Sequence, residues 1–218
     1  TCDILGIYNT GSNRRTFALR KDQTEAVQFL FSTDGSSGSN IASSASVIQL
    51  RTWHHYAVVR DNLVYKIYLD GVLVATDSSS TDAIYTNNDD GLRIGSSYST
   101  DFDGQISNVR IVKGTALYTS NFTPSSEPLT NVSNTKLLCC QSATSASAAT
   151  VAPGTFVNNG TNYSSNNQVT GSAGLTNVDS LFDGHLRASG LPTLNEAALV
   201  SLSSDNYILW TPTTGIPY

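Results

Sequence analysis

The sequence predicts an all-β protein built as an antiparallel sandwich of two sheets. Three observations favour this fold class. Residues 2–142 divide into seven or more short segments, most with alternating apolar and polar side chains. Turn-forming residues separate these segments roughly every 8 to 12 residues. No helical repeat interrupts the region, and Ser, Thr, Asn and Gly supply most of the polarity in a chain that is only 13% charged.

The predicted strands follow one another along this region. In residues 25–32, Val27, Phe29 and Phe31 occupy alternate positions and give the segment one strongly apolar face. The full set of predicted strands is 2–9, 14–21, 25–32, 46–50, 54–60, the two arms of a hairpin within 65–76, 92–97, 102–114 and 136–142, with 32–40 and 80–91 as loops.

The hairpin is predicted from Asp70-Gly71, which lies between two apolar runs. A two-residue type I′ turn needs positive φ at both central residues, and Asp-Gly supplies it. This turn would set the register of the two arms. The expected facing pairs are Leu69 with Val72, Ile67 with Val74, and Tyr65 with Thr76, while Tyr68 and Leu73 share the other face.

The alternation within 102–114 changes phase along the segment. Ile106 fits one face of a strand, whereas Val109 fits the other. A β-bulge near residues 107–108 would reconcile the two phases, because a bulge adds one residue to one strand of a pair.

The composition changes after residue 142, which we predict to be the end of the sandwich domain, 1–142. Residues 143–175 are rich in Ser, Thr and Asn and read as a linker or irregular arm. Residues 176–218 regain apolar groups but are too few to bury a core alone. We expect this segment to pack on the main domain, on another copy, or on a portion not present here. Thr193 and Glu196 fit a capping box, which leaves a short helix and a strand as equal alternatives there.

Three cysteines occur, Cys2, Cys139 and Cys140. Adjacent side chains of a strand point to opposite faces, so Cys139 and Cys140 are not expected to share a metal ion. Buried packing is the first interpretation for the pair. A disulfide from Cys2 to one of them is the alternative, if the first and last strands are neighbours.

Charge and hydropathy exclude two classes of partner. The net charge is −5 with only 12 Lys and Arg, so the basic surface that binds nucleic acid phosphates is missing. No run of 18 or more apolar residues predicts membrane insertion. The chain contains no Met, even at position 1, as expected of a fragment or a processed product.

Several segments taken together resemble a known family. They are "RTWHHYAVVRDN", "YKIYLDGVLVATDSS", "GLRIGSSY" and "FDGQISNVRIVKG", in that order. Their order and spacing resemble the laminin-G-like (LamG), concanavalin A-like jelly roll. The resemblance covers 1–142, and 51–114 is its specific part. The resemblance implies a jelly-roll sandwich with an irregular C-terminal arm.

A second resemblance concerns "GTALYTSNFTPSSEPLT" and "TKLLCCQS". This ending is similar to the LamG-like domains of tail-fibre and other virion structural proteins of bacteriophages, especially those of marine cyanobacteria. It implies a non-enzymatic virion protein, in a tail fibre, a tail appendage or a capsid surface fibre. Such a protein would attach to a host-surface glycan or hold neighbouring subunits, as a homo-oligomer such as a trimer. The alternatives are a secreted cellular carbohydrate-binding or adhesion module and, less favoured, a glycoside hydrolase.

The carboxylates do not fit a glycosidase. Related enzymes place two carboxylates toward one sugar, often as E-x-D-x-E along a strand. Here Glu25, Glu127 and Glu196 are the only glutamates and lie far apart in sequence. Asp101 and Asp103 have the right spacing but fall in a turn.

Two loops offer oxygen ligands and aromatic rings. Hard cations such as Ca²⁺ prefer clustered carboxylate and carbonyl oxygens. Tyrosines that flank such loops can stack on sugar rings, although they also plug the ends of sandwiches. Asn and Asp are equally ordinary turn residues. The candidate Ca²⁺ ligands are Asn88, Asp89, Asp90, Asp101 and Asp103, and the candidate ligand-binding residues are Tyr85 and Tyr98.

Overall fold

The computed structural model describes residues 1–80, 82–86, 90–98, 100–142, 148–152, 154–159 and 207–212, with 155–159 and 207–212 described through their backbone. Every regular element in these ranges is a β-strand, and every strand pair is antiparallel. The predicted all-β, antiparallel class is therefore confirmed. No membrane-spanning helix occurs in the described ranges.

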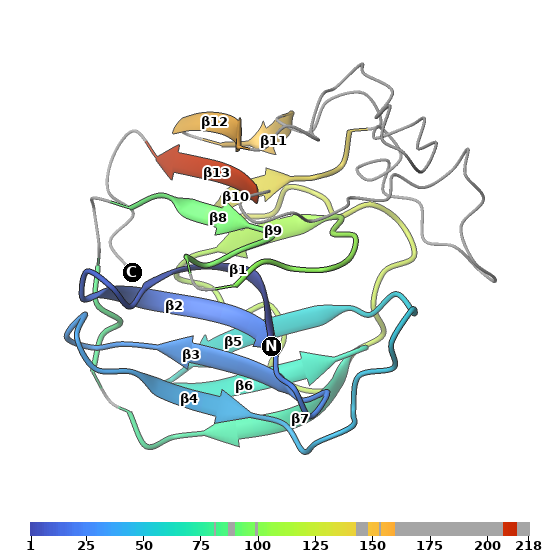
Figure 1. The fold of residues 1–218 in the computed structure, drawn as a ribbon. Coiled ribbons are helices and arrows are strands. Elements are labelled where there is room, and N and C mark those ends of the chain that lie inside the picture. Colours follow the sequence, from blue (N-terminus) through green and yellow to red (C-terminus); the bar gives the residue numbers. More distant parts are fainter. Residues whose placement is uncertain are drawn as a thin grey trace, which may run out of the picture.

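A seven-stranded sheet forms one layer of the sandwich (Figure 1). Its order is β12-β13-β8-β1-β2-β3-β4, so β1, near the start of the chain, is its central strand. The strands are β1 (Cys2–Asn9), β2 (Arg14–Lys21), β3 (Val27–Phe31), β4 (Ser39–Ala42), β8 (Leu92–Ile94), β12 (Gly154–Asn159) and β13 (Tyr207–Pro212).

Two three-stranded sheets pack against this layer. The first, which we call the hairpin sheet, has the order β5-β6-β7, and the second, the distal sheet, has the order β11-β10-β9. Figure 1 shows the hairpin sheet overlying β2 to β4, and β3 contacts β6. The strands are β5 (Tyr56–Asp61), β6 (Val64–Leu69), β7 (Val72–Asp77), β9 (Val109–Val112), β10 (Thr135–Cys139) and β11 (Ala149–Val151).

A single apolar cluster joins all three sheets. Phe29 and Phe31 project from the predicted apolar face of β3 into this cluster. The ring of Phe31 stacks on Tyr65 of β6 with the centroids 4.5 Å apart. Leu137 reaches the same cluster from β10. Burial of these side chains removes apolar surface from water, which is the main force that holds the layers together.

The Asp70-Gly71 turn forms as predicted. Its φ values are 51° and 80°, and Leu69 faces Val72. The register beyond the first pairs was predicted wrongly. Ile67 pairs with Ala75, not with Val74, because a β-bulge places an extra residue in β7. Tyr65 is consequently opposite Asp77.

Residues 46–50, predicted as a strand, form none. Ser46 has a positive φ of 59°, and the backbone N–H of Ile48 bonds to the carbonyl of Glu25 instead of to a strand. Strand β3 pairs with β2 at one edge and with β4 at the other, where Ile41 faces Phe29. The first two residues of β4, Ser39 and Asn40, fall in the loop predicted over 32–40. The strand was not predicted because only one of its side chains, that of Ile41, is buried.

The 102–114 segment is shorter as a strand than predicted. Strand β9 begins only at Val109, directly after Asn108, whose φ is 57°. The phase changes because residues 102–108 lie outside the strand, which begins at Val109, so the predicted bulge is not needed. Asn108 accepts a hydrogen bond from the Leu129 backbone at 2.9 Å.

Contrary to the prediction from their adjacent positions, the side chains of Cys139 and Cys140 do not point to opposite faces. Strand β10 ends at Cys139, and Cys140 has a φ of 60° that turns its side chain into the core as well. All three cysteines are free thiols in the structure. Cys2 lies in β1, whose neighbours are β2 and β8, so the condition for a bridge to β10 is not met.

Segments beyond residue 142 contribute strands to both layers. Strands β11 and β12 lie within 143–175, where a linker was predicted, and β13 lies within 176–218. β13 pairs with both β12 and β8, which attaches it to the large sheet. The capping-box pair at 193 and 196 lies outside the described residues.

Candidate functional site

The candidate residues fall toward the two ends of the large sheet. Asn9 faces Arg14 where β1 meets β2, and we call this the Asn9 end. Cys2 faces Lys21 at the opposite side, the Cys2 end. Because β8 runs antiparallel to β1, the loop before β8 lies toward the Asn9 end. After β8, Gly95 bonds to the Ile4 backbone in the direction of the Cys2 end, whereas the Ser97 carbonyl accepts a hydrogen bond from the Tyr8 backbone.

The loop after β3 forms part of the Asn9 end and is held by Asp34. Its carboxylate accepts hydrogen bonds from the backbone N–H groups of Ser37 at 2.7 Å and Ser36 at 2.8 Å. The hydrogen bond from Ser37 has the largest effect and that from Ser36 the next largest, and together they hold the pKa of Asp34 well below its ordinary value. Arg15 donates to the carbonyl oxygen of Ser36 from the other side of the loop. The loop is therefore ordered by its own polar groups.

Tyr85 packs against this loop. Its backbone N–H donates to the carbonyl of Ser32 at 2.7 Å. A Cβ atom built at Gly35 would lie 2.8 Å from the Tyr85 ring, so the ring covers a glycine that leaves room for it. Tyr85 is half-buried, which leaves part of the ring in contact with solvent.

Tyr98 lies against the start of β8. The guanidinium carbon of Arg93 is 3.3 Å from the centre of the Tyr98 ring, a cation–π contact. The hydroxyl group donates to the carbonyl of Gly91 at 3.0 Å. Tyr98 thus folds back toward the Asn9 end, although its backbone follows β8. One ring face is already occupied by a protein cation.

Asp90 also lies at the Asn9 end. A carboxylate oxygen is 3.6 Å from a guanidinium nitrogen of Arg14, and Asp90 is half-buried. Asn88 and Asp89, the other candidate ligands from this loop, lie outside the described residues.

Asp101 and Asp103 lie on the other side of β8. Asp101 forms an isolated antiparallel bridge with Ser96. Asp103 is exposed, and its backbone forms a hydrogen bond with the Cys2 thiol at the Cys2 end. Asp90 and Asp103 are therefore separated along the length of β1. Within the described part of the chain, no three His, Cys, Asp or Glu side chains are grouped to hold a metal ion.

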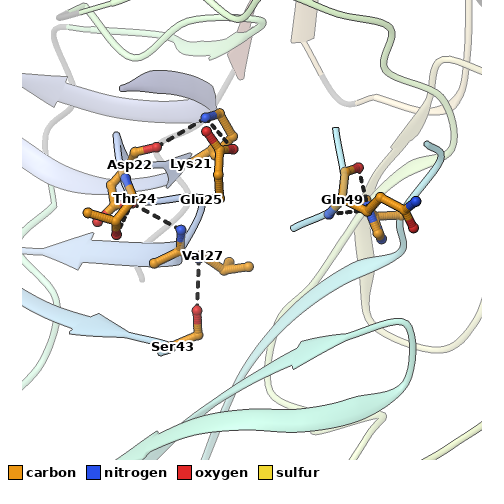
Figure 2. Close-up of polar contacts among 9 residues, drawn as sticks. Lys21, Asp22, Thr24, Glu25, Val27, Ser43 and Gln49 are labelled. Carbon is orange, nitrogen blue, oxygen red and sulfur yellow. Dashed lines mark hydrogen bonds and ion pairs between the residues drawn. The ribbon is translucent and has the colours of Figure 1, made fainter. Parts of the chain in front are cut away.

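The Cys2 end carries its own ordered turn, shown in Figure 2. The Asp22 carboxylate accepts hydrogen bonds from the Thr24 backbone at 2.7 Å and the Ala26 backbone at 3.0 Å. Burial raises the pKa of Asp22, but these bonds outweigh it and the pKa falls below its ordinary value. Lys21 and Glu25 form an ion pair of 2.6 Å beside this turn. Glu25 is thus occupied by a cation.

The hairpin turn includes a contact that the sequence did not reveal. One carboxylate oxygen of Asp70 is 2.6 Å from Nδ1 of His54, and the other accepts from the His55 backbone at 2.8 Å. Nε2 of His54 contacts the Gln49 backbone, at 3.1 Å from the nitrogen and 2.9 Å from the carbonyl oxygen. The only signal in the sequence was the acidic residue at the turn, which its turn propensity already explained.

The "ALYTSNFTP" segment covers the outer face of the hairpin sheet. The rings of Tyr118 and Phe122 stack with centroids 3.7 Å apart, and Phe122 meets His55 edge-on at 5.4 Å. The carbonyl of Thr119 accepts a hydrogen bond from Lys66 at 2.9 Å. The aromatic residues of this segment therefore have structural partners.

The two-layer antiparallel architecture defines a concanavalin A-like sandwich. The family model described as the concanavalin A-like lectin/glucanases superfamily, of the laminin G type, matches residues 3–118. The chain belongs to this superfamily. The comparisons with curated proteins and with solved structures found no match.

Proposed function

We propose that this chain is a non-enzymatic carbohydrate-binding or adhesion module of a virion, located in a tail fibre, a tail appendage or a capsid surface fibre. The observation that carries the binding role is membership of the lectin/glucanases superfamily over residues 3–118. The virion role is supported by the resemblance of the sequence from 114 to 142.

The Asn9 end is the ligand surface that the geometry favours. It carries Tyr85, whose backbone bonds to the loop after β3, together with the Tyr98 hydroxyl and the Arg14–Asp90 ion pair. A half-exposed tyrosine offers both an apolar ring face and a polar edge, which suits a sugar ring. Tyr85 is the stronger candidate, because Arg93 already covers one face of Tyr98.

A glycan array probed with the purified 218-residue chain tests the ligand role. Tyr85→Ala should abolish the array signal, whereas Tyr85→Phe keeps the ring and should retain most of it. Leu50→Ala changes an exposed side chain outside the candidate site and serves as the matched control. Binding that is unchanged in Tyr85→Ala, with the variant folded by circular dichroism, would contradict this site.

The carboxylates support the non-enzymatic role. A retaining glycosidase needs two carboxyl groups about 5 to 5.5 Å apart across the scissile bond. Glu25 and Asp103 both lie at the Cys2 end, but Glu25 is held in an ion pair by Lys21, and Glu127 is exposed in the segment after β9. Release of reducing sugar from any array ligand, lost in Asp103→Asn, would overturn this part of the proposal.

Immunoelectron microscopy tests the virion role. Antibody raised against this chain should label a fixed position on the particles. Particles that remain unlabelled would favour the second candidate, a secreted cellular adhesion module. Bound Ca²⁺ is a separate question, answered by repeating the array after EDTA treatment, where loss of signal would support a cation at the loops.

We also propose that the chain assembles with copies of itself, such as a trimer, as fibre proteins do. Exposed apolar side chains at Val72 and Leu73 are compatible with subunit contacts. Sedimentation equilibrium should give a mass above that of one chain, and a monomer at high concentration would contradict assembly.

A further inference from the structure

The adjacent residues Cys139 and Cys140 place two thiols in contact inside the core. Their sulfur atoms are 3.6 Å apart, and both residues are fully buried. Adjacent side chains of a regular strand point to opposite faces. The pair shares one side only because the chain leaves the strand at Cys140 with a φ of 60°.

This backbone conformation is held from outside the pair. A positive φ is uncommon for residues other than glycine and persists where the surroundings impose it. The carbonyl of Cys140 accepts hydrogen bonds from the Asn108 backbone at 3.0 Å and from the Ser107 hydroxyl at 3.3 Å. The next residue, Gln141, donates to the carbonyl of Leu129 at 2.7 Å. Several segments therefore converge on the turn that brings the thiols together.

The surroundings suit a covalent bond better than a metal ion. Both cysteines belong to the apolar cluster, and no group of three or more His, Cys, Asp or Glu side chains able to hold a metal includes them among the described residues. A zinc site needs at least three protein ligands. Two sulfur atoms in contact without further ligands are the arrangement from which a disulfide forms.

We propose that Cys139 and Cys140 form a vicinal disulfide that fixes the turn at the end of β10. The oxidant is a small-molecule disulfide such as oxidised glutathione. One cysteine thiolate attacks it and releases one glutathione thiol. The second cysteine thiolate then attacks the mixed disulfide at the protein sulfur and releases the other. The net change is two protein thiols and one glutathione disulfide converted to one protein disulfide and two glutathione thiols.

The closed core slows thiol exchange at this pair. Contact with the Cys140 thiol, followed by burial, raises the pKa of Cys139 far above its ordinary value in the folded chain. The thiolate is the reactive species, so exchange in the closed core is slow. The bond encloses almost no loop, so it removes little chain entropy from the unfolded state. Its effect is on the conformation of the turn.

Peptide mapping of the wild-type chain tests the pairing. The protein is refolded with oxidised and reduced glutathione, quenched in acid, denatured, alkylated without reductant and digested with trypsin. Cleavage after Arg14 and after Lys136 places Cys2 in a different peptide from the pair. The expected result is an alkylated Cys2 and an unalkylated Cys139–Cys140 peptide that is two hydrogen atoms lighter than its reduced form. Two alkyl groups on the pair, or a peptide linked to Cys2, would overturn the proposal.

Two variants make the assignment independent of Cys2. Cys2→Ser should still yield the oxidised pair, and it should accept two alkyl groups only after reduction. Cys140→Ser should leave Cys139 open to one alkyl group in the denatured chain. A Cys2→Ser chain that takes up two alkyl groups without reductant would contradict the vicinal bond even if the wild type were ambiguous.

Discussion

The hairpin sheet and the distal sheet cover the same core but are built differently. The hairpin sheet is one continuous segment, with two-residue turns at Asn62-Leu63 and Asp70-Gly71 that have positive φ throughout. The distal sheet joins strands that are far apart in the chain, and side chains such as Asn108 position its connections. Local turn chemistry therefore connects the strands of one sheet, whereas the other depends on contacts between segments that are distant in sequence.

We expect the largest losses of stability from substitutions in the shared core, and we expect them to be similar in the two sheets. Ile67 in β6 and Leu137 in β10 are both fully buried in the shared cluster. Ile67→Ala and Leu137→Ala should each lower the free energy of unfolding by about 2–5 kcal/mol, because each leaves a cavity. Urea denaturation measures this, with the exposed Leu50→Ala as control at under about 0.5 kcal/mol. A large loss at one site alone would show that the sheets do not share one cooperative core.

The hairpin turn should tolerate no side chain at Gly71. Its φ is 80°, and a Cβ there would lie 1.8 Å from the Phe122 carbonyl oxygen. We expect Gly71→Ala to lower the free energy of unfolding by roughly 3 kcal/mol. Gly114 has a similar φ of 84° with no atom within 4 Å, so Gly114→Ala should show the backbone strain alone, about 1 kcal/mol. Equal losses in the two variants would mean that the Phe122 contact is unimportant.

Asn108 should stabilise the chain connection beside the distal sheet, as Gly71 does the turn of the hairpin sheet. Its Oδ1 accepts hydrogen bonds from the Leu129 backbone and the Gln141 side chain, both at 2.9 Å. Asn108→Ala should lower the free energy of unfolding by about 2 kcal/mol, because it leaves these donors unpaired and strains a positive φ. The matched control is Asn134→Ala, which also has a positive φ but is exposed. A smaller loss at Asn108 than at Asn134 would contradict this role.

We expect the smallest change in stability from Tyr56→Phe in the hairpin sheet, because the ionisation of Tyr56 has almost no effect at neutral pH. Burial, with smaller contributions from the Asp70, Cys2 and Glu25 charges, raises the pKa of Tyr56 to about 12. In the unfolded chain the pKa is about 10, so the unfolded state ionises first as the pH rises. The stabilisation is fully present below pH 10 and is lost between about pH 10 and 12. Urea midpoints measured from pH 8 to 12 should fall less in Tyr56→Phe than in the wild type, and parallel curves would exclude the effect.

Part of the candidate site was predictable and part was not. The sequence located Tyr85 and Asp90 in the loop that precedes β8, whereas the contact of Tyr98, which follows β8, with Gly91 depends on the fold. It could not place Asp103 relative to Asp90, because their separation depends on the direction in which β8 pairs with β1. A pairing between segments that are some 90 residues apart leaves no periodic trace in either segment.

The sequence by itself determined the strand class, the apolar face of β3 and the Asp70-Gly71 turn, because alternation and turn propensity are local properties. Only the tertiary structure decided which strand pairs with β3 at the edge opposite β2, where β9 begins, and that Cys139 and Cys140 face the same side. Each of those outcomes depends on a hydrogen bond or a packing contact with a distant segment, and Ile48, Asn108 and Cys140 carry these contacts. Local sequence therefore determines which segments form strands of this class, whereas strand boundaries and the contact between the two thiols depend on the closed core.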